Sequence, residues 1–348
     1  KNSYFCYMRS TVQNRNQTAD LLKGLAVIFM IQVHLMELFA TPEIYSSWIG
    51  KISLFLGGPP AAPIFMVVMG YFFAQSKRAV LSNIFRGLKL ILLGFVLNLG
   101  LNMNLFFKIA DGTYQTSPWP YVFGVDILFL AGLSIILLSI MKHFFKLKLL
   151  PYIILLAIVF ILQLFQFAPA TNETLQYIQA YFVGNGTWWS YFPVVPWLAY
   201  PVTGFVLYIA LLKIKTPFNT LQNYLLIISG ILFFVFVNYG IEISANLPEY
   251  YNHRLAFFLF TLCFMVFYAI IANIISNQKE TKLTQWVEWL GINVTAAYII
   301  QWLFIGNIAT EVYKTQSILQ LIFWFLAALL ATSLGIYLWN RINLKFRH

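Results

Sequence analysis

Long blocks of apolar residues alternate with short polar segments along the whole sequence. A hydrocarbon core about 30 Å thick requires roughly 20 apolar residues to span it as a helix. The apolar residues come in continuous runs, whereas a membrane β-barrel would require them to alternate with polar ones. The pattern therefore predicts an all-α fold, a polytopic membrane bundle of about ten transmembrane helices. The predicted spans are 20–41, 60–76, 84–105, 121–141, 149–168, 193–213, 219–243, 255–276, 287–310 and 318–340.

The composition agrees with this prediction and excludes a water-soluble enzyme. Hydrophobic residues make up 60% of the chain and charged residues only 9%, whereas soluble proteins have about 25% charged residues. The longest segment outside the spans, 169–192, is too short to fold alone, so we expect residues 1–348 to form a single integral-membrane domain. The two cysteines, Cys6 and Cys263, lie far apart, and no Cys/His spacing suits a metal, so neither a disulfide nor a metal site is expected.

The basic residues are unevenly distributed, and this predicts an orientation. The chain has 22 Lys and Arg against 11 Asp and Glu, a net charge of +11. All but four of the basic residues fall in alternate loops or at the chain ends; the exceptions are Lys51, Lys108, Arg254 and Lys314. Because short cytoplasmic loops are enriched in Lys and Arg, we expect a multi-pass protein of the plasma (inner) membrane with both termini cytoplasmic. This orientation explains the positive charge. We therefore expect membrane lipid as a partner and no nucleic acid.

The first span holds the most informative polar residues, because ionisable side chains at membrane depth are costly and mark functional sites. Asp20, Lys23, His34 and Glu37 all lie in or beside it. Eleven residues, almost three helical turns, separate Lys23 from His34, so the two share one face of the helix. Imidazole is the side chain best suited to move a proton near neutral pH, and Glu37 is placed to orient it. The alternatives are a hydrogen-bonded core histidine and a solvated Glu37.

The same residues resemble a family signature. The spacing of Arg15, Asp20, Lys23 and His34 is similar to the opening pattern of the membrane acyltransferase superfamily, which in acyltransferase family 3 reads Arg-x4-Asp-x2-Arg-x10-His. Lys23 stands in the second Arg position, which keeps the charge but loses the guanidinium fork. The aromatic segment from Gly57 to Phe72 also resembles the family's second helix.

Further along, two elements resemble bacterial relatives of heparan-α-glucosaminide N-acetyltransferase. These are the basic opening of the third span, from Arg86 to Gly94, and the Pro-x-x-Pro-Trp element from Pro193 to Trp197. A late segment, 289–302, resembles a family element that often carries His where Gln301 stands. His34 is therefore the best single catalytic candidate.

The resemblance implies transfer of an acyl group, most simply acetyl, from cytoplasmic acetyl-CoA to a sugar or glycan facing outward. His34 would be the general base or, alternatively, an acyl-accepting nucleophile. A cationic inner end could bind the phosphates of CoA, although the same cations also satisfy the positive-inside rule. These candidate donor-binding residues are Arg15, Lys23, Arg78, Arg86 and Lys89.

Candidate acceptor-binding residues lie at the predicted outer ends of later spans. Tryptophans could stack on a sugar face, and buried polar groups could line an outer cavity. An aromatic belt and hydrogen bonds between packed helices are the alternatives. The candidates are Asp126, Trp188, Trp189, Pro193, Trp197, His253 and Arg254.

Two other functions compete with an acyltransferase. Asp126, Asn238 and Glu242 could line the path of a transporter for a small polar solute, but the repeats typical of transporters are not found. A non-catalytic scaffold is the third possibility, which the intact His34 disfavours. The acceptor, the acyl length, the choice between ester and amide, and the formation of a homodimer stay open.

Overall fold

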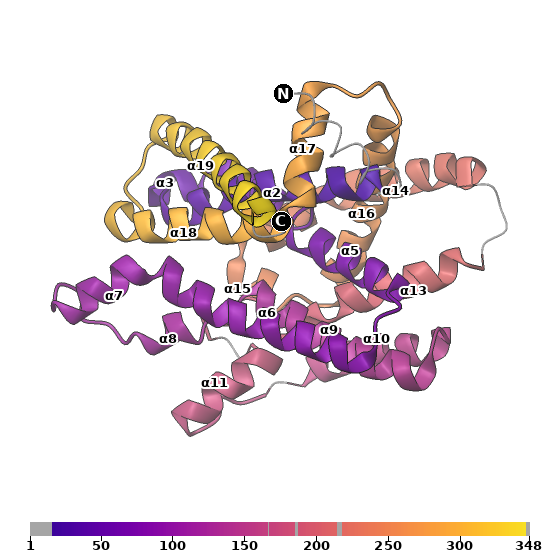
Figure 1. Ribbon diagram of the computed structural model, residues 1–348, viewed down its shortest axis with the longest axis horizontal. Coiled ribbons are helices and arrows are strands. Elements are labelled where there is room, and N and C mark those ends of the chain that lie inside the picture. The colour runs from indigo at the N-terminus through magenta and orange to yellow at the C-terminus, as the bar shows by residue number, and fades with distance from the viewer. Residues whose placement is uncertain (1–15, 166, 185–186, 214–217, 346–348) are drawn as a thin grey trace.

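The computed structural model describes residues 16–165, 167–184, 187–213 and 218–345, and within these ranges the fold is all-α (Figure 1). Only isolated β-bridges join extended segments in the described ranges. The long helices and their direct extensions are α2 Gln17–Leu38, α4 Trp48–Gly57, α5 Ala62–Gln75, α6 Val80–Leu101, α9 Ile127–Phe145, α10 Leu149–Leu164, α12 Val194–Trp197, α13 Ala199–Leu211, α14 Phe218–Ala245, α16 Leu255–Ser276, α17 Lys282–Ile292, α18 Val294–Val312 and α19 Ile318–Lys345.

Short helices connect them. Several of these gather at one end of the bundle, where Figure 1 shows α3, α7 and α8 at the left. The connecting helices are α3 Pro42–Ser46, α7 Met103–Ala110, α8 Trp119–Val122, α11 Glu173–Phe182 and α15 Leu247–Tyr251.

Every predicted span contains a helix, but one span is sharply bent. In the described part of the chain, eight helices are long and apolar enough to cross a membrane, and α10 is shorter. The predicted span 287–310 is instead two helices, α17 and α18, which meet at an angle of 86°. Asn293 lies at the break: its Nδ2 donates to the Trp289 carbonyl, and its Oδ1 accepts from Asn340. These bonds satisfy polar groups that lipid could not.

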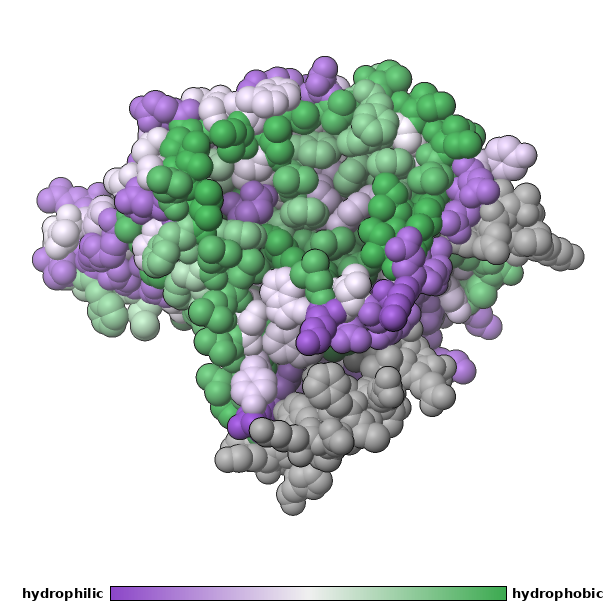
Figure 2. Space-filling view, turned by 90° about the horizontal axis from the view of Figure 1, so that it is seen from above, coloured by the Kyte–Doolittle hydropathy of each residue, from purple (hydrophilic) through white to green (hydrophobic). Residues whose placement is uncertain are grey.

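The surface of the bundle is apolar over broad areas, as Figure 2 shows for one face. On α19, the large side chains of Leu319, Phe323, Leu326 and Leu330 are all mostly exposed. They follow one another at three- and four-residue intervals and so form a continuous stripe. Such a stripe requires a lipid environment, and the chain is a multi-pass membrane protein. The side of the membrane on which the termini lie stays a prediction.

Helix α2 lies at the centre, in contact with α4, α5, α16, α17, α18 and α19. Its tightest contact is with α17, through a pair of glycines. A Cβ atom on Gly24 would lie 1.8 Å from the carbonyl oxygen of Val287, and one on Gly291 would lie 1.9 Å from that of Asp20. The two backbones therefore touch directly, as small residues allow in membrane helices. This contact fixes the position and rotation of α2, and with them its polar face.

Candidate functional site

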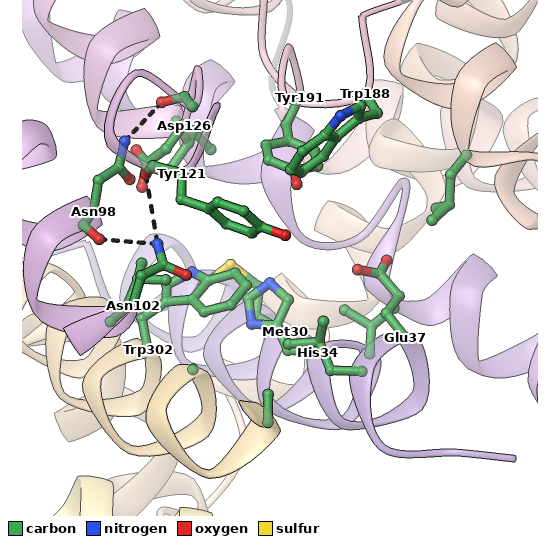
Figure 3. Close-up of a pocket in the computed structure, with 18 of the residues that line it drawn as sticks. Met30, His34, Glu37, Asn98, Asn102, Tyr121, Asp126, Trp188, Tyr191 and Trp302 are labelled. Atoms are coloured by element: carbon green, nitrogen blue, oxygen red, sulfur yellow. Dashed lines mark hydrogen bonds between the residues drawn. The ribbon is translucent and has the colours of Figure 1, made fainter. Parts of the chain in front are cut away.

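The polar face of α2 borders a cavity of about 550 Å³, which we call the aromatic cavity (Figure 3). Tyrosine and tryptophan side chains dominate its lining, together with a few polar groups. The lining includes Met30, His34, Glu37, Asn98, Asn102, Tyr121, Asp126, Ile127, Trp188, Tyr191, Tyr298 and Trp302. Its volume and mixed lining are typical of a small-molecule site.

His34 rests against an aromatic ring. Its imidazole and the Trp302 indole from α18 have ring centroids 3.9 Å apart and planes inclined by 32°. The imidazole makes no hydrogen bond with the described residues, and its Nδ1 is buried without a partner. Packing rather than hydrogen bonding thus holds the ring. Because Nδ1 is buried, Nε2 is the nitrogen that stays available to a bound molecule, as a general base requires.

Glu37 lies one turn further along α2 and lines the same cavity. Figure 3 shows its carboxylate turned into the cavity, away from the imidazole of His34. No hydrogen bond joins the two side chains among the described residues. The contact that orients His34 in this structure is therefore the one with Trp302, and not the expected one with Glu37.

Asp126 is buried and caps the N-terminus of α9. One carboxylate oxygen, Oδ1, accepts the Leu128 backbone N–H, and the other, Oδ2, accepts the Tyr298 hydroxyl at 2.8 Å. Both oxygens are thus occupied by the protein. Asp126 ties the start of α9 to α18.

Two asparagines on α6 support the loop opposite His34. Asn98 Nδ2 donates to the carbonyls of Val122 and Gly124, and Asn102 Nδ2 donates to the Asn98 carbonyl. Figure 3 shows the side chain of Tyr121, from the neighbouring helix α8, extending into the cavity above His34. These hydrogen bonds of Asn98 and Asn102 therefore hold a cavity wall in place.

A second cavity of about 310 Å³, the basic cavity, lies further toward the N-terminal end of α2. Lys23 from α2 and Arg86 from α6 line it, together with apolar side chains. Lys23 Nζ lies 2.6 Å from the Asp20 carboxylate, so its charge is largely compensated. Arg86 is exposed and forms no ion pair with the described residues. Arg86 is therefore the stronger candidate to bind an anion here.

The other predicted donor-binding cations are not gathered around this cavity. Arg78 and Lys89 are exposed and do not contribute to its lining. Arg15 lies outside the described residues. Of the predicted donor-binding cations, Lys23 and Arg86 are thus the ones that line this cavity among the described residues, and the role of the others stays a prediction.

Of the predicted acceptor-binding residues, Asp126 and Trp188 line the aromatic cavity, whereas the others do not. Trp189 packs against Tyr177. Pro193 is buried at the start of α12. Arg254 is exposed at the start of α16.

Trp197 and His253 lie in a buried cluster and line neither cavity. The Trp197 indole N–H donates to the Tyr251 carbonyl, and its ring is fully buried. His253 Nδ1 donates to the Tyr250 carbonyl, so its Nε2 accepts the Tyr200 hydroxyl at 3.0 Å. Burial lowers the pKa of His253 to about 4, which keeps this imidazole neutral.

Sequence reasoning missed the aromatic residues that shape the site, Tyr121, Tyr298 and Trp302. One signal was present: Tyr298 and Trp302 are four residues apart in the late family-like segment and so share a helix face. Gln301, the position where the family often has His, is fully buried and lines neither cavity. No group of three or more His, Cys, Asp or Glu within the described ranges could hold a metal ion.

The fold and the two cavities define a multi-pass membrane protein with a histidine-bearing pocket. A family model described as an acyltransferase domain, that of acyltransferase family 3, matches residues 16–341. The match covers nearly the whole chain, so the protein belongs to this family, and the resemblance in the sequence is confirmed. It is a membrane acyltransferase. Searches of curated proteins and of solved structures gave no match.

Proposed function

We propose that the protein transfers an acetyl or other short acyl group from acyl-CoA to a sugar or glycan on the opposite side of the plasma membrane, with its termini in the cytoplasm. The observation that carries this proposal is the position of His34: its imidazole faces the larger cavity, has no hydrogen-bond partner among the described residues and rests against the ring of Trp302. On the same helix, Lys23 faces the basic cavity. Family membership removes the support for a transporter.

In the proposed reaction, His34 removes the proton from an acceptor hydroxyl or amine as that group attacks the thioester carbonyl carbon. The resulting tetrahedral intermediate expels the CoA thiolate, which takes the proton back from the imidazolium. A covalent acyl-imidazole is the alternative route, in which His34 attacks first and the acceptor second. Tyr121, Trp188 and Tyr191 offer ring faces and hydroxyls to a sugar. Arg86 and Lys23 would receive phosphate oxygens of the donor.

The test uses purified protein in lipid nanodiscs, radiolabelled acetyl-CoA and a set of neutral and amino-sugar oligosaccharides. We expect label to enter at least one oligosaccharide, and His34→Ala to lower the rate by about 10²–10⁴-fold, the range for loss of a general base. His143→Ala is the matched control, because His143 is exposed at the end of α9. Full activity of His34→Ala would contradict the assignment. Release of the label by mild base distinguishes an ester product from an amide.

A further inference from the structure

The two cavities share a wall. Met30, Ile127 and Tyr298 are the residues that line both the aromatic and the basic cavity, and all three are buried. They come from three different helices: α2, the first turn of α9, and α18. Any molecule that occupies both cavities at once must pass between these side chains.

Two of the three wall residues are held in place by Asp126. This carboxylate caps α9, whose first residue is Ile127, and it accepts the Tyr298 hydroxyl at 2.8 Å. The hydroxyl proton of Tyr298 is thereby committed to Asp126. Met30 is the third residue, and it has an unbranched side chain with three rotatable bonds. The movable part of the wall is therefore Met30.

The order of residues along α2 matches the order of groups in an acyl-CoA. Lys23, Met30 and His34 lie on one face, at intervals of seven and four residues. At 1.5 Å per residue, His34 lies about 16 Å from Lys23, and Met30 lies about 10 Å from it. The pantetheine arm has about thirteen bonds from phosphorus to sulfur. An extended polypeptide covers about 3.3–3.6 Å for every three backbone bonds, so an extended arm of this size is roughly 15 Å long. A phosphate near Lys23 and Arg86 would thus place the thioester beside His34.

The charges that line the two cavities argue against a position of the CoA phosphates in the aromatic cavity. Among the described residues, the lining of the aromatic cavity includes the carboxylates Glu37 and Asp126 but no Lys or Arg. The aromatic cavity therefore offers the phosphates of CoA no cation, whereas the basic cavity offers Arg86. The donor is better accommodated if only its uncharged arm reaches the aromatic cavity.

We propose that Met30 is a movable gate between the two cavities, through which the pantetheine arm carries the thioester to His34. This inference rests on the proposed function, because it takes acyl-CoA as the donor. Rotation of the Met30 side chain opens the passage, while Asp126 keeps Ile127 and Tyr298 fixed. In the absence of an arm, Met30 separates the aromatic cavity from the cytoplasmic donor.

The test measures passage without requiring a known acceptor. In a Cys6→Ser, Cys263→Ser background, His34→Cys introduces a thiol in the aromatic cavity. CoA 2-pyridyl disulfide is the probe: the introduced thiolate attacks the CoA sulfur, a new disulfide forms, and pyridine-2-thione leaves. The CoA adduct is followed by intact mass. Methyl methanethiosulfonate, which is small and uncharged, reports on the reactivity of the thiol itself.

We expect Met30→Trp to slow CoA attachment by at least about tenfold, equivalent to 1.4 kcal/mol, and to leave the small reagent nearly unaffected. Leu326→Trp is the matched control, because Leu326 is exposed on α19 and lines neither cavity; it should leave CoA attachment unchanged. Ile127→Trp narrows the same passage from α9. It replaces Met30→Trp in the test if Met30→Trp fails to fold.

Unchanged CoA attachment in both Met30→Trp and Ile127→Trp would overturn the gate. So would a failure of CoA to modify the introduced thiol in a protein that still binds CoA. Failure of the protein with His34 intact to bind CoA at all, measured by calorimetry, would instead overturn the proposed donor. The two failures are therefore distinguishable.

Discussion

Replacement of Trp302 by leucine tests whether this residue acts by positioning His34. The change removes the ring on which the imidazole rests, while the cavity wall stays apolar. An aromatic contact contributes about 0.5–1.5 kcal/mol beyond its buried area, which corresponds to a loss of about twofold to thirteenfold in kcat at 1.36 kcal/mol per tenfold. Displacement of the imidazole by about 1 Å would extend the loss toward 10²-fold. We expect kcat to fall within this range.

The assay is steady-state acetyl transfer at varied acyl-CoA concentration. Because Trp302 does not line the basic cavity, the KM for acyl-CoA should stay within about twofold, well below the tenfold that 1.4 kcal/mol would produce. Trp302→Phe keeps an aromatic face and should restore most of kcat.

A double-mutant cycle separates positioning from other roles of Trp302. If the residue acts only through His34, Trp302→Leu should add no further loss in a His34→Ala background. Two results would refute the reasoning. One is a full additional loss in that background; the other is a raised KM with unchanged kcat, which would make Trp302 a binding residue.

Three further predictions follow from described contacts. Arg86→Gln should raise the Kd for acyl-CoA by about tenfold, the lower end expected for charged hydrogen bonds, while Lys89→Gln should not; equal effects would contradict the role of the basic cavity. Gly24→Leu should lower the free energy of unfolding by about 3 kcal/mol or more, because the added side chain meets the Val287 backbone; thermal unfolding in detergent, with exposed Leu88→Ala as control, measures this. Because the pKa of His253 is lowered to about 4 by burial, its stabilising contribution is complete above about pH 6.5 and decreases by up to about 3 kcal/mol toward pH 4. Thermal unfolding followed across this pH range should show that loss in the wild type but not in a His253→Gln variant.

Much of the fold was predictable because apolar blocks report directly on membrane helices. The span 255–276 coincides with α16 Leu255–Ser276. The break inside 287–310 was not predictable in the same way, because α17 and α18 are both apolar and no proline separates them. The bend depends on hydrogen bonds from Asn293 to residues on two helices. Tertiary contacts of this kind leave no periodic signal.

The relative positions of site residues were predictable only for residues on the same helix. Lys23 and His34 share a face because helical geometry alone decides this. Trp197 and His253, which were predicted to bind the acceptor, are buried and line neither cavity. Polar or aromatic identity alone does not reveal whether a side chain faces a cavity or the core. Trp302 was missed for the opposite reason: it contacts His34 across 268 positions of sequence, and its partner becomes evident only in the folded chain.

The glycine contact between α2 and α17 has a mechanical consequence. Lys23, Met30 and His34 belong to one helix whose backbone is pressed against another without intervening side chains. Distances along that helix are set by its rise per residue and do not change when neighbouring helices shift. Helix α2 therefore holds these three side chains at fixed distances from one another, and the proposed transfer from acyl-CoA relies on this separation. Conformational changes in this enzyme should alter which molecules reach Lys23, Met30 and His34, while the spacing between these residues stays constant.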